Sequence, residues 1–382
     1  MTLVSSERRI GLALVVACST VATNALAQDT SVGIQPLQWE FQDDTVIRIY
    51  GQLNQGVLVF DDGDESTSYG LVDNDNSSTR LGIRSVTDYD SGWELFSNIE
   101  FEYQPHPSNS VNQLDKNDAD FGFDKTNFRK AEVRVASEQY GRFWLGQGSM
   151  ASDGIAEVDL SGTGVIAYSS VSDIGGGLFR FDDGALSDVS TGGAFSNLDG
   201  AGRKMRVRYD TRSFSGFRLK ASYGQDTLND KDDSIYDIAA TYEGSFETFE
   251  IGAAVGYAQD DGADQATYAG SVSGLHTPTG LSLTLATGGR DSDDDPSYGY
   301  VKLGYERNFF ATGSTAFSID YYDGEGIVND DSESTAYAFA FVQNVDNWDT
   351  QWYLALRQYE YDDDAGAYED GLATMAGLRI RF

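Results

Sequence analysis

The sequence predicts an all-β fold in which sixteen antiparallel strands close into a membrane-spanning β-barrel. Three observations carry this prediction: the periodicity of the strands, the lengths of the connections between them, and the way the chain ends. The composition agrees, since 42 glycines, 22 tyrosines and 21 phenylalanines accompany only 5 prolines, as is usual in proteins made of strands and turns. No apolar run approaches the roughly 18 residues that a spanning helix needs. If this chain crosses a membrane, it does so as strands.

The first 27 residues have the pattern of a secretory signal peptide. Arg8 and Arg9 precede the apolar run 10–18, and residues 25–27 (Ala-Leu-Ala) form a small-residue cleavage site. A charged start, an apolar centre and small residues at the cut are the three parts of such a signal. The sequence therefore predicts export from the cytoplasm.

We expect the mature chain to begin at Gln28, with residues 28–45 as a periplasmic N-terminal segment and 46–382 as the barrel. One alternative is that the run before Cys18 acts as a lipobox, which would place a lipid on that cysteine. Cys18 is the only cysteine of the chain. The exported protein is therefore expected to have neither a disulfide nor a reactive thiol.

Sixteen segments alternate apolar and polar side chains with the period of two that a β-strand has. They span residues 46–60, 79–88, 91–103, 126–137, 140–149, 203–210, 216–225, 234–243, 249–258, 266–275, 281–288, 298–307, 314–323, 334–343, 351–361 and 372–382. An even number of strands lets both ends of the chain lie on one side of the membrane, as in single-chain outer-membrane barrels.

The lengths of the connections alternate along the chain. Every second connection is short, as at 89–90 and 138–139, whereas the others are mostly longer and acidic, the longest being 150–202. Short periplasmic turns and long outer loops are typical of outer-membrane barrels. A soluble β-sandwich has no reason to sort its loops in this way.

The chain ends on a strand with a terminal aromatic residue. Its last eleven residues alternate apolar side chains with polar or small ones. One face carries Leu372, Ala376, Leu378, Ile380 and Phe382, and the other carries Ala373, Gly377, Arg379 and Arg381. Chain ends of soluble domains usually fray, whereas a barrel must pair its last strand with its first to remove both edges. This ending favours the outer membrane.

Strand parity places nine basic side chains on the inward face of five strands. They are Arg80, Arg84, Arg134, Arg142, Lys204, Arg206, Arg208, Arg218 and Lys220. In a barrel such charges cost least when they face water inside. The long connection 150–202 offers acids to oppose this basic wall, namely Glu157, Asp159, Asp173, Asp182 and Asp183.

Several stretches resemble the Gram-negative general porins, which are trimeric sixteen-stranded barrels. Residues 205–224 (Met-Arg-Val-Arg-Tyr-Asp-Thr-Arg-Ser-Phe-Ser-Gly-Phe-Arg-Leu-Lys-Ala-Ser-Tyr-Gly) are similar to the sixth and seventh strands of that family. Residues 78–84 resemble its second strand, residues 140–146 its fifth, and Tyr50-Gly51 its first. The resemblance covers nearly all of the mature chain, more weakly in the later strands.

The resemblance implies a water-filled channel for passive diffusion of small hydrophilic solutes and ions. It implies that the third outer loop folds into the lumen, where Glu157, Asp159 and Asp173 would face the basic wall as constriction acids. It also implies a homotrimer in outer-membrane lipid and lipopolysaccharide, with no cofactor, metal or catalytic residue. Phe382 resembles the terminal signal by which the barrel-assembly machinery recognises porins.

Two other interpretations stay open. The first is a channel of the same architecture that selects sugars or oligosaccharides, for which Trp144, Tyr298 and Tyr300 face inward by parity. The second is a secreted soluble β-protein that acts on polysaccharide. Detergent dependence separates the second from a porin, because only a membrane barrel needs detergent or lipid.

Other chemistry finds little support in the sequence. His106 and His276 would lie at opposite faces of the membrane, so they favour no hydrolytic site. The acidic runs 61–65, 291–295 and 362–364 carry oxygen ligands suited to divalent cations but lack the spacing of a calcium loop, and solvated loops are the favoured interpretation. A net charge of −35 argues against nucleic acid as a partner.

Overall fold

The computed structural model describes residues 37–41, 44–116 and 121–382. The predicted signal peptide, Cys18 and the expected mature start at Gln28 lie outside the described residues. Among these residues no helix is long and apolar enough to span a membrane. The short helical pieces are α1 (Thr191–Ala194) and the 3-10 turns η1 (Asp75–Ser77), η2 (Lys125–Asn127), η3 (Val171–Ile174), η4 (Thr227–Asn229) and η5 (Asp346–Trp348).

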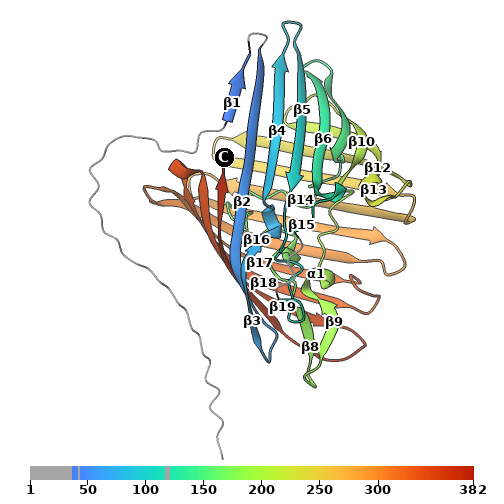
Figure 1. The fold of residues 1–382 in the computed structure, drawn as a ribbon, viewed down its shortest axis with the longest axis vertical. Helices are drawn as coiled ribbons and strands as arrows, with labels where there is room; N and C mark the ends of the chain where they lie inside the picture. The colour runs from blue at the N-terminus through green and yellow to red at the C-terminus, as the bar shows by residue number, and fades with distance from the viewer. Residues whose placement is uncertain (1–36, 42–43, 117–120) are drawn as a thin grey trace, which may run out of the picture. The chain divides into compact units, whose positions relative to one another are not determined.

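Sixteen long strands form the barrel (Figure 1). They are β2 (Thr45–Asp61), β4 (Arg80–Asp88), β5 (Trp93–Glu102), β6 (Phe128–Ser137), β7 (Gly141–Ser149), β10 (Arg203–Asp210), β11 (Phe217–Gln225), β12 (Ser234–Phe246), β13 (Phe249–Asp260), β14 (Gln265–His276), β15 (Leu281–Asp291), β16 (Ser297–Phe310), β17 (Gly313–Glu325), β18 (Glu333–Val345), β19 (Thr350–Asp362) and β21 (Gly371–Arg381). The predicted sixteen-stranded antiparallel barrel is confirmed, with strand ends within about three residues of those expected from the alternation.

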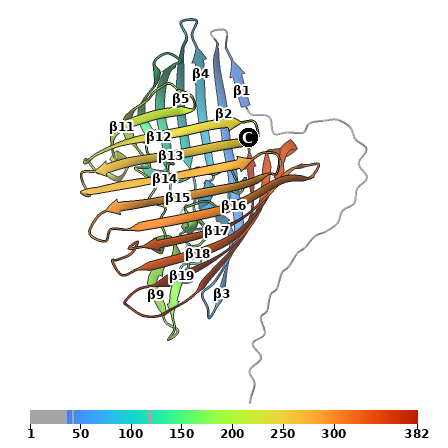
Figure 2. The ribbon, with the colours of Figure 1, turned by 180° about the vertical axis from the view of Figure 1, so that it is seen from behind.

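Each barrel strand pairs antiparallel with the next one along the chain, and Figure 2 shows β12 to β19 following one another in this way. The last strand closes the ring, because β21 pairs with β2 from Gln52 opposite Arg381 to Asp61 opposite Leu372. The two strands therefore leave no open edge between them, as the sequence predicts.

Five further strands lie outside the sixteen that the alternation predicts. β1 (Leu37–Glu40) pairs with the start of β2, and β3 (Ser66–Asp73) pairs with its second half. β8 (Leu178–Phe181), β9 (Leu186–Ser190) and β20 (Tyr368–Glu369) form a separate small sheet that joins the third outer loop to the last one. β1 lies before the first barrel strand and the others lie in outer connections. Except for β3, they have five residues or fewer, over which alternation gives little signal.

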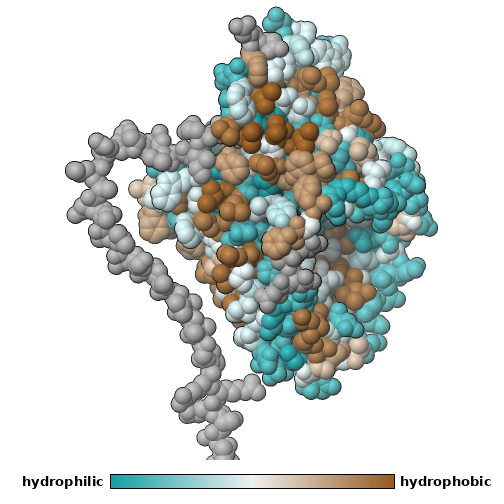
Figure 3. Space-filling view, in the orientation of Figure 1, coloured by the Kyte–Doolittle hydropathy of each residue, from teal (hydrophilic) through white to brown (hydrophobic). Residues whose placement is uncertain are grey.

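The two faces of the barrel differ in chemistry. On β4, Leu81 and Ile83 point outward and are 50% and 52% exposed, whereas Arg80 and Arg84 point inward. Hydrophobic side chains gather over β2, β4 and β5 on the face seen in Figure 3. Exposed aromatic residues cluster where strands meet the short turns, as with Tyr140, on which the half-buried Trp93 stacks at 5.7 Å between ring centres. Such an apolar band with aromatic residues at its rim suits a bilayer and its interface.

Candidate functional site

The interior of the barrel is crossed by the connection between β7 and β10, residues 150–202, which we call the third loop. Its base is closed by a hydrogen bond from Met150 N to Gly202 O at 2.9 Å. From there its backbone bonds to inward side chains of successive wall strands. Ser152 N donates to Asp237 (2.7 Å) and Leu160 N to Ser273 (2.9 Å), while the hydroxyl of Tyr359 donates to Val171 O (2.7 Å). The small polar side chains of β12 and β14 thus supply the partners that a buried loop backbone needs.

Asp159 fastens the third loop to the wall. Its carboxylate lies 2.8 Å from Lys302 Nζ of β16, and the same ammonium group donates to Ala167 O at 2.6 Å. Both side chains are buried. The family resemblance implies that Asp159 is one of the constriction acids, but the structure places it in this seam between loop and wall and not in the open interior.

A cavity of about 490 Å³ lies between the third loop and the wall. Six acids and three arginines line it: Asp75, Glu102, Asp153, Glu157, Asp173 and Asp199 face Arg80, Arg129 and Arg203. Of the acids expected to oppose the basic wall, Glu157 and Asp173 are here. Asp182 and Asp183 lie instead in the turn between β8 and β9.

The acids on the loop side of this cavity lie close to one another; Asp173 is buried, and the others are half-buried. Asp173 accepts hydrogen bonds from Tyr168 (2.7 Å) and Ser170 (2.8 Å). Burial, helped by the carboxylates of Asp199 and Asp153, raises the pKa of Glu157 to about 8. Burial likewise raises the pKa of Asp199 to about 6. The negative charge of this loop face therefore depends on pH within the neutral range.

All nine predicted basic residues lie on inward faces of β4, β6, β7, β10 and β11, and several are held by carboxylates that were not singled out from the sequence. Arg206 pairs with Glu132 at 2.5 Å, and Lys204 pairs with Asp226 at 2.7 Å. Arg134 pairs with Glu94, and Arg208 with Asp210 of the same strand. The parity that placed the basic residues would also have placed Glu94 and Glu132 on the inward face.

Arg129 is an interior residue that parity cannot find. By alternation with the exposed Val133 it should point outward. The register of β5 with β6 shifts between Glu100 and Phe101, and this irregularity turns Arg129 inward, as bulges do. There its guanidinium contacts Glu100 and Glu102, each at 2.9 Å.

The aromatic residues predicted to face inward do so, but they do not form an exposed row of rings on which sugars could stack. Tyr298 and Tyr300 are buried. Trp144 lies among guanidinium groups, with Arg134 4.9 Å and Arg206 5.7 Å from its ring centre. Within the described ranges no group of three or more His, Cys, Asp or Glu side chains could hold a metal ion.

A closed barrel with an apolar outer band and a charged interior narrowed by a loop defines an outer-membrane channel for passive diffusion. The sequence model of the Gram-negative porin family matches residues 12–364. The chain therefore belongs to the Gram-negative porin family. No curated protein sequence matches it.

Solved structures of outer-membrane channels share the fold. The anion-selective porin from Comamonas acidovorans superposes with a TM-score of 0.60 at 17% identity, covering 88% of this chain and 100% of that one. OmpT of Vibrio cholerae in its trimer form superposes with a TM-score of 0.56 at 17% identity, covering 89% of this chain and 100% of that one. OmpF of Salmonella typhi in complex with daunomycin superposes with a TM-score of 0.54 at 12% identity, covering 91% of this chain and 100% of that one. At such identities the likeness establishes the architecture.

Proposed function

We propose that small hydrophilic solutes pass through a constriction at the 490 Å³ cavity, where loop acids face wall arginines. The observation that carries this proposal is the opposition of charges: Asp153 and Glu157 come from the third loop, whereas Arg80 comes from β4. Charges on opposite walls of a narrow aqueous passage orient hydrated, dipolar solutes and concentrate counter-ions. The lining contains more acids than arginines, so we propose a modest preference for cations.

Thiol labelling tests where the channel is narrowest. The only cysteine precedes the expected mature start, so a single introduced cysteine would be the only labelled site. In Asp153→Cys, a bulky neutral thiol reagent should cut the single-channel conductance sharply. Asp261→Cys also removes one acid, but it lies on an exposed outer turn, so labelling there should change little. Equal effects at both positions would contradict the constriction proposal.

We propose further that the protein is a homotrimer. One structurally similar protein, OmpT of Vibrio cholerae, has been solved in a trimer form. In this chain β4 to β7 have 9 or 10 residues, whereas β16 to β19 have 13 or 14. A low wall with an apolar outer face is suited to contact with neighbouring copies. Native mass spectrometry in detergent should show three chains, and a single-chain mass would contradict the proposal.

We also propose that the signal peptide is removed after Ala27 and that transport involves no catalysis. The intact mass of the purified protein tests the first point, since a chain that starts at Gln28 differs from one that carries a lipid on Cys18. Activity assays on polysaccharide and ester substrates test the second. Lipid, lipopolysaccharide and the barrel-assembly machinery are the partners that an outer-membrane barrel of this family would meet.

A further inference from the structure

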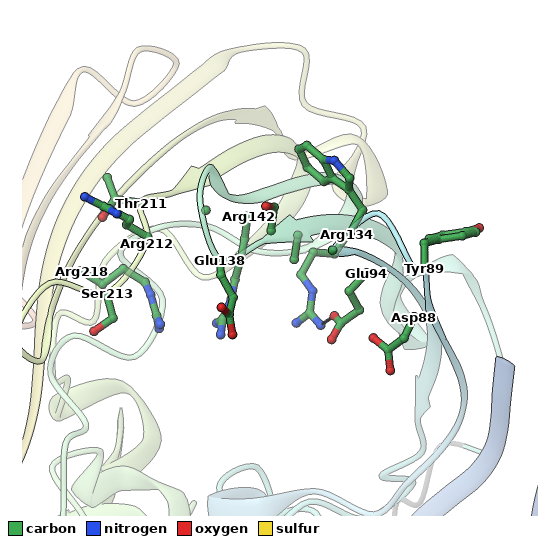
Figure 4. A pocket seen from close by; sticks show the side chains of 15 residues that line it. Asp88, Tyr89, Glu94, Arg134, Glu138, Arg142, Thr211, Arg212, Ser213 and Arg218 are labelled. Atoms are coloured by element: carbon green, nitrogen blue, oxygen red, sulfur yellow. Dashed lines mark hydrogen bonds and ion pairs between the residues drawn. The ribbon is translucent and has the colours of Figure 1, made fainter. Parts of the chain in front are cut away.

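A second charged cavity lies at the short-turn end of the barrel, away from the constriction (Figure 4). It has a volume of about 560 Å³ and is lined by the ends of β4, β5, β6, β7 and β11 and by the turns next to them. We call it the vestibule, and its arginines Arg134, Arg142 and Arg218 the vestibule arginines. Along β5, the vestibule residue Glu94 is about 20 Å from Glu100, which contacts the constriction arginine Arg129.

The vestibule arginines point the same way into the barrel. In Figure 4 their guanidinium groups lie in a row, while Arg212 on the adjoining turn points away from them. The positive charges of Arg218 and Arg134 act on Arg142, and the carboxylates of Asp210 and Glu94 act on it in the opposite sense. Three like charges held together repel one another unless an anion or water screens them.

Arg142 and Arg218 lack a fixed carboxylate partner. Within the described part of the chain the ion pair of this cluster joins Arg134 to Glu94, and neither of the other two takes part in an ion pair. The carboxylate of Asp210 is held by Arg208 at 2.7 Å and by Trp144 Nε1 at 3.2 Å. Glu138 also lines the vestibule, but it is exposed on the turn.

Two nitrogen atoms of this cluster are buried without a hydrogen-bond acceptor among the described residues, namely Nε of Arg134 and Nε of Arg218. A buried donor without an acceptor is costly, so such atoms commonly mark the place of water or a bound ion. Arg134 is also held in place, because its guanidinium stacks over Phe96 at 4.7 Å and over Trp144 at 4.9 Å. The cluster is therefore a set of partly unsatisfied donors on a rigid wall.

We propose that the vestibule is a binding site for a small oxyanion, held chiefly by Arg142 and Arg218. The planar forks of guanidinium groups match the paired oxygens of phosphates and carboxylates. An anion there would satisfy the free donors and relieve the repulsion among the three arginines. The site holds anions transiently on the periplasmic side of the acidic constriction, and it does not depend on the constriction proposal.

Inorganic phosphate is the probe. Added to the wild-type channel in a planar bilayer bathed in potassium chloride, it should reduce the single-channel current in a saturable way. In Arg142→Gln/Arg218→Gln the half-saturating concentration should rise about tenfold or more, because two charge-assisted hydrogen-bond partners are lost. Arg142→Lys/Arg218→Lys keeps the positive charges but loses the planar guanidinium groups. Its half-saturating concentration should lie between those of the wild type and of the glutamine double variant.

Arg307→Gln is the control, since it removes an exposed positive charge from the same end of the barrel at a residue that does not line the vestibule. Its half-saturating concentration should stay within about twofold of the wild type, as expected for screened surface charges. Three results would overturn the site: no saturable reduction in the wild type, no change in either vestibule double variant, or an equal change in the control. Conductance without phosphate and labelling at Asp153 test the constriction separately, so failure of one proposal leaves the other standing.

Discussion

At the scale of single residues, charged side chains inside this barrel are mostly held in pairs. Arg357 donates to both carboxylate oxygens of Asp320 at 2.7 and 3.0 Å, with both side chains fully buried. Lys302 and Asp159 form a second buried pair. Such a pair adds little net stability, because desolvation offsets the attraction, yet removal of one partner leaves an uncompensated buried charge.

Lys302→Met tests the seam between the third loop and the wall. The change leaves Asp159 buried without its counter-charge, so we expect a loss of about 3–5 kcal/mol of stability. The third loop should also become more sensitive to protease in the folded protein. Unfolding by urea in lipid vesicles measures the first effect and digestion the second.

The double variant Lys302→Met/Asp159→Asn is the control, because it removes the uncompensated charge. It should recover most of the lost stability. If both variants were as stable as the wild type, Asp159 would not be anchoring the loop.

We expect Glu157 to make the ion selectivity of the channel sensitive to pH. Burial and the nearby carboxylates of Asp199 and Asp153 raise its pKa to about 8, so Glu157 takes up a proton as the pH falls through this value. The cation preference should therefore be stronger above about pH 8 and weaker below about pH 6. The raised pKa of Glu157 also makes the stability of the fold depend on pH. The contribution of Glu157 to stability is full below its unfolded pKa and is lost as the pH rises through about 8.

Reversal potentials across a salt gradient at several pH values measure this effect. In Glu157→Gln the upper part of the pH dependence should be absent, while the part that comes from Asp199 remains. A selectivity that stays constant over the whole range would show that these carboxyl groups do not face the permeating ions.

At the scale of elements, the strands followed from the sequence because alternation persists over nine or more residues in nearly all of them. The inward basic residues followed from the same period. Arg129 did not, because a local register shift between β5 and β6 turns it inward. The places of Asp159 and Glu157 depend on the path of the third loop across the barrel, which is set by distant partners such as Lys302. The sequence of the third loop by itself therefore does not predict this path.

The last strand is the element whose removal should matter most for assembly. Gly51 and Phe382 exchange two backbone hydrogen bonds at 3.0 and 3.1 Å, which complete the closure of the barrel. A side chain at Gly51 would meet the ring of Phe382 within 2.8 Å and the carbonyl of Arg80 within 2.6 Å. The aromatic ring and the glycine therefore fit against each other.

Deletion of Phe382 should lower the amount of protein inserted in the outer membrane while export continues. The deletion removes the two closing hydrogen bonds and the terminal aromatic residue together. Phe382→Tyr, which keeps the backbone and a ring, should insert nearly as well as the wild type. Membrane fractionation measures both. Normal insertion of the shortened chain would mean that closure and recognition do not need this residue.

At the scale of the whole molecule, negative charge is spread over two depths. The outer loops expose acids such as Asp291, Asp293 and Asp295 at the mouth, whereas Glu157 is half-buried and Asp173 is buried beside the 490 Å³ cavity. Salt screens exposed charges over a Debye length of roughly 10 Å at 0.1 M and 3 Å at 1 M, and buried charges much less. The two sets should therefore be separable by salt.

Glu157→Gln/Asp173→Asn should move the reversal potential toward anions at both salt concentrations, measured above about pH 8, where Glu157 is ionised. Asp293→Asn/Asp295→Asn also removes two acids, but only from the mouth, so its effect should be clear at low salt and nearly vanish at high salt. The wild type should show a modest cation preference that declines as salt rises. Clear anion selectivity of the wild type at low salt would mean that the basic wall outweighs the loop acids, and that Glu157 and Asp173 do not set the charge of the narrowest point.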